Sequence, residues 1–208
     1  MRSDMPGENG FTLIELMTVV SIMLIVLAIS SFVFISEVPT VRLRGAAQNL
    51  AATLQFIKVR AVVSNRYAWF HADPANRFYT GFVDESSFGT IQPSEYAQSN
   101  LDMPDTSGST PGFFLPTGIS FGLPAGYSSG AGPDGIPYPG ASATIVNAPG
   151  NYVGFRSTAI PVVNFVSNAT PSSPVVIFLT NSKGEGRAVS IHITGRIKTF
   201  QWYGGSWR

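Results

Sequence analysis

The residues GFTLIELM, 10–17, open an apolar run that continues to Ile35 and determines the architecture of the chain. The run reads FTLIELMTVVSIMLIVLAISSFVFI from Phe11 onward and contains neither proline nor glycine. At 1.5 Å per residue, a helix of this length spans the ~30 Å hydrocarbon core of a bilayer. A secretory signal peptide has its small-residue cleavage site after a shorter apolar region, whereas here Gly10 precedes the run. Cleavage at Gly10 would therefore leave the hydrophobic segment on the mature protein.

One residue, Glu15, does not fit an ordinary membrane span. A carboxylate inside a spanning segment is costly and usually has a partner or a function. Two simpler interpretations are open: the side chain reaches the lipid headgroups, or it caps the helix N-terminus, where negative charge is favoured. The residues that surround Glu15 favour a third, functional interpretation.

These residues, GFTLIELM, resemble the type III signal of type IV prepilins and type II secretion pseudopilins. The resemblance implies that a prepilin peptidase cleaves between Gly10 and Phe11 and that the new Phe11 amine is N-methylated. It also implies that Glu15 pairs, in a filament of packed helices, with the Phe11 ammonium of a neighbouring subunit, which fixes the axial register. The leader MRSDMPGENG departs from the family pattern because Arg2 is its one basic residue.

Helical periodicity continues after the apolar run and predicts an amphipathic second half of the same helix. The segment Phe56–Trp69, FIKVRAVVSNRYAW, resembles the end of this helix in the GspH/FimT-type pseudopilin family, through Arg60, Ala61 and neighbouring residues. Asn65 is suited to end the helix in a left-handed conformation. The apolar stripe, which should lie on a sheet, consists of Leu43, Ala46, Ala47, Leu50, Leu54, Ile57 and Ala61.

Short runs rich in β-branched and aromatic residues predict an antiparallel head. Alternation in AVSIHIT, residues 188–194, predicts a strand buried on one face, with His192 on the exposed face. The motif GFVD at residues 81–84 and the ending AVSIHITGRIKTFQW both resemble the GspH/FimT-type head. The predicted strands are residues 69–70, 78–83, 113–115, 119–121, 151–155, 161–166, 175–180, 188–194 and 196–202, with a turn at 72–76 and a hairpin tip at 181–186.

Residues 85–150 are rich in glycine, proline and serine, as in the run SSGAGPDGIPYPGASA. This is the composition of loops, and long loops are commonly functional or disordered. We therefore expect a loop region on the filament surface or facing a partner, with the two short strands at 113–115 and 119–121.

Composition gives little support for catalysis. The 13 basic and 12 acidic residues give a net charge of +1, so any electrostatic site must be local. With no cysteine, disulfides and thiolate metal sites are excluded. His71 and His192 are the only histidines, and neither has a carboxylate at metal-ligand spacing or a nucleophile-elbow motif. We expect no catalytic residue, metal or cofactor.

The C-terminal sequence GRIK, residues 195–198, resembles the GRxR turn of FimT-type minor pilins, which is implicated in DNA uptake. A glycine turn would expose Arg196 and Lys198 on one side of the strand, where both meet phosphates. Trp202, Trp207 and Arg208 lie nearby in sequence and would stack on bases or hold the backbone. The alternative is a structural hairpin turn with solvated cations and aromatic rings that pack in the core.

The fold class predicted is therefore α+β and pilin-like, with one long helix on an antiparallel sheet. The segments are a leader (1–10), a membrane and filament-core helix (11–36), its amphipathic continuation (37–66) and a β-rich head (67–208). The resemblance implies a minor pilin or pseudopilin, anchored in the inner membrane with a periplasmic head before assembly. Its partners would be other pilin subunits, the prepilin peptidase and the inner-membrane assembly platform, with DNA as an alternative ligand. A membrane-anchored enzyme with an uncleaved anchor is a third hypothesis, which predicts tolerance of Glu15→Ala.

Overall fold

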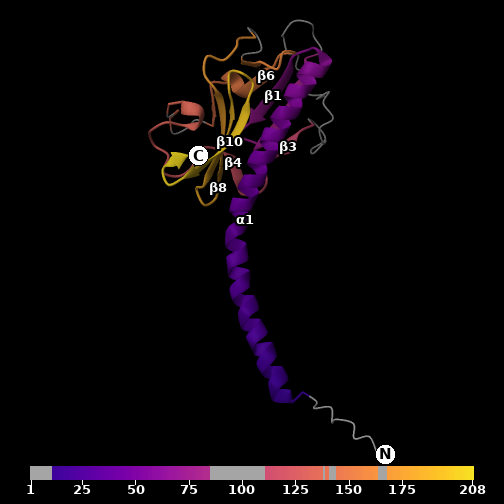
Figure 1. Cartoon of the computed structure of the whole chain (residues 1–208), viewed down its shortest axis with the longest axis vertical. Helices are drawn as coiled ribbons and strands as arrows, with labels where there is room; N and C mark the ends of the chain where they lie inside the picture. Colours follow the sequence, from indigo (N-terminus) through magenta and orange to yellow (C-terminus); the bar gives the residue numbers. More distant parts are fainter. Residues whose placement is uncertain (1–10, 85–110, 138, 141–143, 164–167) are drawn as a thin grey trace, which may run out of the picture. The chain divides into compact units, whose positions relative to one another are not determined.

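The computed structural model describes residues 11–84, 111–137, 139–140, 144–163 and 168–208, and for residues 31–36 it describes the backbone alone. The chain divides into two compact units, residues 1–38 and residues 39–208. The first unit carries the apolar part of a long helix, and the second is a β-rich head that includes the rest of that helix (Figure 1).

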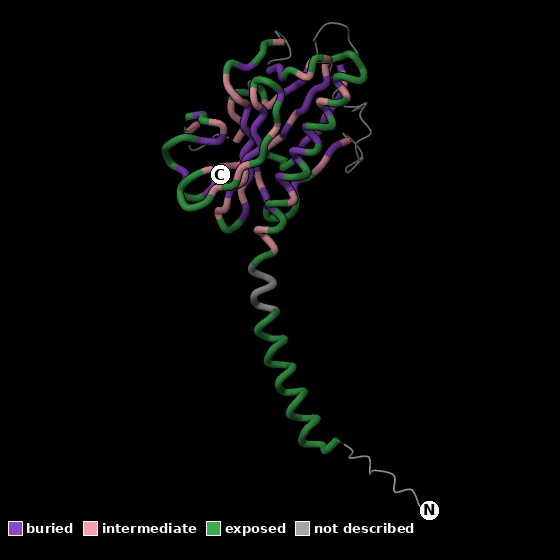
Figure 2. Tube along the Cα trace, in the orientation of Figure 1, coloured by how far each residue is buried: buried purple, intermediate pink, exposed green. Residues whose placement is uncertain are grey.

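The helix, α1 (Leu13–Ser64), is 52 residues long. In the first unit its stretch Leu13–Ser30 has a mean hydropathy of 2.5 and is long and apolar enough to cross a membrane. Residues 11–30 are exposed around the whole circumference of the helix (green in Figure 2). Because an apolar surface of this extent is unfavourable in water, it requires lipid or other helices to cover it.

In the head, the predicted apolar stripe is confirmed: it forms the buried face of α1 (Figure 2). Leu50, Leu54 and Ile57 are fully buried, and the other stripe residues are at most 3% exposed. The helix ends as expected at Asn65, whose φ of 52° is left-handed. The N–H of Asn65 donates to the Val62 carbonyl at 3.3 Å and that of Arg66 to the Ala61 carbonyl at 3.2 Å. These bonds satisfy two of the carbonyls that a helix end leaves unpaired.

The described residues of the head form two antiparallel sheets, both with one face toward α1 (Figure 1). The first has the strand order β3-β2-β1-β6-β7, and the second has the order β11-β10-β9-β8-β4, with β5 also paired to β8. Two short 3-10 helices are η1 (Pro133–Gly135) and η2 (Pro149–Asn151). The strands are β1 (Ala68–Asp73), β2 (Phe78–Val83), β3 (Phe113–Phe114), β4 (Ile119–Phe121), β5 (Ile145–Val146), β6 (Tyr152–Phe155), β7 (Pro161–Val163), β8 (Val175–Asn181), β9 (Gly186–Ile191), β10 (Ile197–Tyr203) and β11 (Ser206–Trp207).

Most predicted strands are confirmed with ends shifted by one to three residues. The β1–β2 hairpin pairs Ala68 with Val83 and Asp73 with Phe78, and the β8–β9 hairpin turns at the predicted tip. Strands β5 and β11 were not predicted. The predicted strand at residues 161–166 corresponds to β7, which ends at Val163, and residues 164–166 lie outside the described residues.

The prediction that residues 188–194 form a strand buried on one face is wrong. Strand β9 ends at Ile191, and both of its faces are buried: Val189 and Ser190, which point to opposite faces, are each fully buried. His192 belongs to the following turn, because its N–H donates to the Arg196 carbonyl at 2.8 Å. A polar residue such as Ser190 at an alternating strand position is expected to face solvent, but here a loop covers the outer face of the sheet.

That loop corrects the expectation for residues 85–150. Residues 85–110 lie outside the described residues, but part of the remainder packs on the outer face of β8 and β9. Tyr127 and Ile136 are 4% and 2% exposed, in one cluster with Phe178 of β8 and Ala188 of β9. The glycine-rich and proline-rich segment therefore contributes to the core through large side chains such as Tyr127 and Ile136.

Candidate assembly and binding sites

The start of α1 is a capping box formed by Thr12 and Glu15. The Thr12 N–H and hydroxyl donate to Oε2 of Glu15 at 3.0 and 2.9 Å, and the Glu15 N–H donates to the Thr12 hydroxyl oxygen at 3.3 Å. This reciprocal pattern satisfies N–H groups that a helix start leaves unpaired. In the isolated subunit Glu15 therefore caps the N-terminus of α1, as one of the simpler interpretations expected. The same contacts hold the carboxylate next to residue 11, and the other carboxylate oxygen can accept a further hydrogen bond.

Phe11, the residue on the mature side of the predicted cleavage point, lies just before the helix and is 84% exposed. Gly10 lies outside the described residues. Apart from threonines, the exposed side chains around Glu15 are apolar, among them Leu13, Ile14 and Leu16. The start of the helix therefore presents one carboxylate in an otherwise hydrophobic surface, which favours an ionic partner as soon as water is removed.

The predicted C-terminal turn joins β9 to β10 and contains Gly195, whose φ is +79°. The Lys58 ammonium of α1 donates to the Gly195 carbonyl at 3.0 Å. A Cβ at Gly195 would overlap the carbonyl oxygen of Ala159, in the turn between β6 and β7. Glycine is thus required both by the backbone conformation and by close packing. The turn is fixed on two sides, and Arg196 emerges from it exposed.

Lys198 of β10 lies close to an acidic group. Its ammonium is 3.7 Å from Oδ1 of Asp134, in the loop that covers the sheet. Asp134 is only 9% exposed, and its Oδ2 accepts a hydrogen bond of 2.5 Å from the Ser190 hydroxyl. Part of the charge of Lys198 is therefore balanced within the head. No sequence pattern indicates this pair, because Asp134 and Lys198 lie far apart in the chain.

The aromatic residues near the C-terminus pack against one another. Trp202 and Trp207 have ring centroids 5.4 Å apart, and each lies within 6 Å of the Tyr127 ring. Phe178 of β8 completes the cluster at 5.5 Å from Trp207. Of the two alternatives for the tryptophans, stacking on bases and packing in the core, the structure shows packing. Arg208 lies instead over the exposed Tyr203 ring, 5.3 Å from its centroid.

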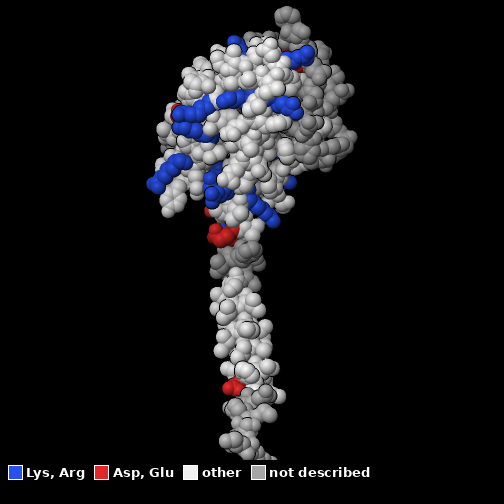
Figure 3. Space-filling model, turned by 45° about the vertical axis from the view of Figure 1, so that its right-hand side comes forward, with Lys and Arg blue, Asp and Glu red and all other residues white. Residues whose placement is uncertain are grey.

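Basic side chains are spread over one face of the head (Figure 3). Arg196, Lys198 and Arg208 contribute to the exposed cations of this unit, and all three lie on or beside β10. Among the described residues, no group of three or more His, Asp or Glu side chains is placed to hold a metal ion.

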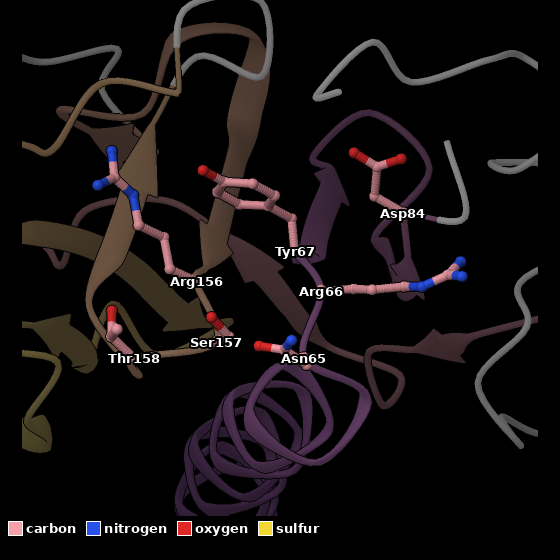
Figure 4. Close-up of a pocket in the computed structure, with 7 residues that line it drawn as sticks. All are labelled: Asn65, Arg66, Tyr67, Asp84, Arg156, Ser157 and Thr158. Carbon is pink, nitrogen blue, oxygen red and sulfur yellow. The ribbon is translucent and has the colours of Figure 1, made fainter. Parts of the chain in front are cut away.

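A cavity of about 380 Å³ lies beyond the end of α1 (Figure 4). Arg66 and Asp84 lie on one side of Tyr67, and Arg156, Ser157 and Thr158 lie on the other. The Arg156 guanidinium donates to the Asn168 carbonyl at 2.7 Å. That bond ties the chain after β6 to the segment after β7, so the arginine has a structural role.

Comparison with known proteins gives one family match and several structural neighbours. Residues 5–31 match the family described as the prokaryotic N-terminal methylation motif. The minor pseudopilin EpsH from the Type 2 Secretion System of Vibrio cholerae is 12% identical, with a TM-score of 0.43 over 79% of this chain and 99% of that one. The type IV minor pilin FimU of Pseudomonas aeruginosa is 14% identical, with a TM-score of 0.41 over 80% and 97%. No curated protein sequence matches.

The methylation motif covers the segment that the sequence singled out, from the leader to the apolar helix. That helix continues into a second half packed on antiparallel sheets, which is the architecture expected from the resemblance. The chain thus carries a prokaryotic N-terminal methylation motif at the start of an α+β fold in which one long helix packs on antiparallel sheets.

Proposed function

We propose that the chain is a minor pilin or pseudopilin, a structural subunit that assembles through its N-terminal helix into a type II secretion pseudopilus or a type IV pilus. Before assembly, α1 anchors the subunit in the inner membrane with its head in the periplasm. A prepilin peptidase removes residues 1–10, and the assembly platform then transfers the helix from lipid into the filament. The transfer is feasible because packed apolar helices replace lipid by side chains of similar polarity.

The observation that supports this proposal is the single carboxylate at the start of an exposed, apolar helix. The capping box positions Glu15 beside residue 11, where cleavage would create a positive amine. In a filament core without water, an unpaired carboxylate is strongly disfavoured, and a neighbouring Phe11 ammonium compensates it. A pairing of this kind favours one axial offset between subunits, since neighbouring helices must bring residues 11 and 15 together.

The experiment compares Glu15→Ala with Glu37→Ala, a change at an exposed carboxylate of the same helix outside the apolar run. Filaments are sheared from cells that express the full chain and its companion subunits, and the amount of this subunit is measured. We expect Glu15→Ala to be processed but largely missing from filaments, and Glu37→Ala to be incorporated normally. Equal incorporation of both variants would exclude a role of Glu15 in assembly.

A second candidate function is DNA binding, and the exposed cations around β10 favour it. Arg196 projects from a turn that Lys58 and Ala159 hold rigid, and Arg208 lies near the same strand. Two features weaken it: Lys198 has Asp134 as a counter-charge, and the tryptophans pack inward. Such a site would bind phosphates with a strong dependence on salt.

The test measures retention of DNA by the full chain in detergent micelles at increasing salt. Arg196→Ala/Lys198→Ala is compared with Arg77→Ala, a cation at the turn between β1 and β2. DNA binding predicts a weaker retention and a shallower salt slope in the double variant alone. If both variants retain DNA as the unchanged chain does, the C-terminal turn is a structural hairpin.

A further inference from the structure

A second hollow, of about 360 Å³, opens where the beginning of the head's helix meets the β8–β9 hairpin and the end of β10. Thr40 and Leu43 of α1 form one wall, the hairpin residues 183–187 form another, and residues 201–204 form the third. All these residues belong to the head unit. The turn that carries Arg196 is not among the described residues that line it.

Two cations and one carboxylate line this hollow. Lys183 and Arg187 line it, and the pKa of Arg187 is lowered, first by burial and then by the nearby Arg44 guanidinium. The lining carboxylate, Glu185, accepts hydrogen bonds from the Thr40 hydroxyl at 2.8 Å and from the Asn181 amide at 2.6 Å. Among the lining residues one carboxylate thus accompanies two cations, and the exposed Arg44 adds a third positive charge close enough to lower the pKa of Arg187, while Glu185 raises it. The Arg187 guanidinium also donates to the Gln201 side-chain oxygen at 3.0 Å. Like charges brought together in this way favour binding of an anion between them.

The remaining walls are amphipathic. Leu43 is buried, Trp202 is half-buried, and the Tyr203 ring is 63% exposed beneath the Arg208 guanidinium. Tyrosine and tryptophan side chains with one apolar and one polar end are enriched where proteins meet the headgroup region of a membrane. The hollow therefore combines a site for a phosphate with surfaces suited to the glycerol region next to it.

The chain itself keeps this hollow near the bilayer. Thr40 follows the end of the apolar run at Ile35 by five residues. Even a fully extended chain covers no more than about 18 Å in five residues, so Thr40 stays within that distance of Ile35 at any orientation of the head. Lipid headgroups are consequently within reach while the helix is in the membrane.

We propose that the hollow between α1, the β8–β9 hairpin and β10 binds the phosphate group of an anionic phospholipid through Lys183, Arg187 and Arg44. The proposal rests on the proposed function only in that α1 is inserted in a membrane, and it does not require filament assembly. The bound headgroup holds the head at the bilayer surface until the subunit is extracted. A free phosphate ion offers the same chemistry, and the experiment separates the two sources.

The test uses Lys183 as its own reporter. The chain has three lysines, Lys58, Lys183 and Lys198, so acetylation of each by a small amine reagent can be followed by mass spectrometry. The full chain is reconstituted in nanodiscs of phosphatidylglycerol, in nanodiscs of phosphatidylcholine, and in the latter with inorganic phosphate. With the site mostly occupied, we expect acetylation of Lys183 to fall by about threefold in phosphatidylglycerol relative to phosphatidylcholine, with Lys58 and Lys198 unchanged.

Variants decide whether that protection comes from the hollow. Arg44→Gln, at an exposed position, and Arg44→Gln/Arg187→Gln should restore the reactivity of Lys183, whereas Arg66→Gln at the far end of α1 should not. Protection by inorganic phosphate in phosphatidylcholine nanodiscs would assign the site to free phosphate. The proposal would be overturned if phosphatidylglycerol protected all three lysines equally from acetylation, or if Lys183 remained protected in the double variant. It would also be overturned if the acetylation of Lys183 were the same in every nanodisc preparation. None of these outcomes depends on whether the chain enters a filament.

Discussion

Replacing Gly195 by alanine should destabilise the head through two separable effects. The first is conformational: with φ at +79°, a residue that has a Cβ costs about 1–2 kcal/mol. The second is steric: the new methyl group would overlap the carbonyl oxygen of Ala159. That carbonyl moves with difficulty, because the turn around it is closed by the Ala159 N–H bond to the Arg156 carbonyl at 2.8 Å. Overpacking of this kind adds about 1–3 kcal/mol.

Gly118 is the matched control, since its φ is +84° and a Cβ there would meet nothing within 4 Å. Gly118→Ala should therefore show the conformational cost alone, and Gly195→Ala should lose a further ~1–3 kcal/mol of unfolding free energy. The assay is urea unfolding of the full chain in detergent micelles, followed by tryptophan fluorescence, because Trp69, Trp202 and Trp207 all lie in the head. Equal losses in the two variants would refute the claim that the C-terminal turn is packed tightly against the β6–β7 turn.

Three further predictions use the same unfolding assay. Leu50→Ala, in the fully buried stripe of α1, should cost about 2–5 kcal/mol, whereas Val63→Ala, 73% exposed, should cost less than about 0.5 kcal/mol; similar values would mean that the stripe does not pack on the sheets. Asp134→Ala should cost about 1–3 kcal/mol, because it leaves the buried Ser190 hydroxyl without its hydrogen-bond acceptor. Lys198→Ala should cost less than about 1 kcal/mol, because it removes a partly exposed ion pair. A larger loss in Lys198→Ala than in Asp134→Ala would show that the ion pair contributes more than the hydrogen bond. Burial lowers the pKa of His71 more than the nearby carboxylate of β1 raises it, so near neutral pH the unfolded chain binds more protons than the folded one. The unfolding free energy should therefore fall as the pH drops below about 6.5, and His71→Gln should remove this dependence. An unchanged pH profile in His71→Gln would contradict this prediction.

The sequence predicts the features that arise from local pattern. The stripe from Leu43 to Ala61 follows from helical periodicity, and the end of α1 follows from the tolerance of Asn65 for a left-handed backbone. The strands follow from runs of β-branched and aromatic residues between turn residues. Each of these signals comes from residues that are near neighbours in the chain.

What the sequence could not predict depends on contacts between distant segments. Ser190 looks like a solvent-facing position, yet it is fully buried under a loop, where Asp134, 56 residues away, accepts a hydrogen bond from its hydroxyl. The partial neutralisation of Lys198 has the same origin. The grouping of basic residues around Arg187 could not be predicted either, because Arg44 lies on the helix and Lys183 on a hairpin. No spacing rule links such residues before the chain is folded.

The proposed assembly mechanism requires a free amine at residue 11, since only that group can neutralise a neighbour's Glu15 in a dry helix bundle. Mass spectrometry of the N-terminus, on protein extracted from membranes and from filaments, measures this amine directly. We expect a mature chain that begins with N-methylated Phe11 in both fractions. Subunits that start at Met1 and are nevertheless incorporated into working filaments would contradict it.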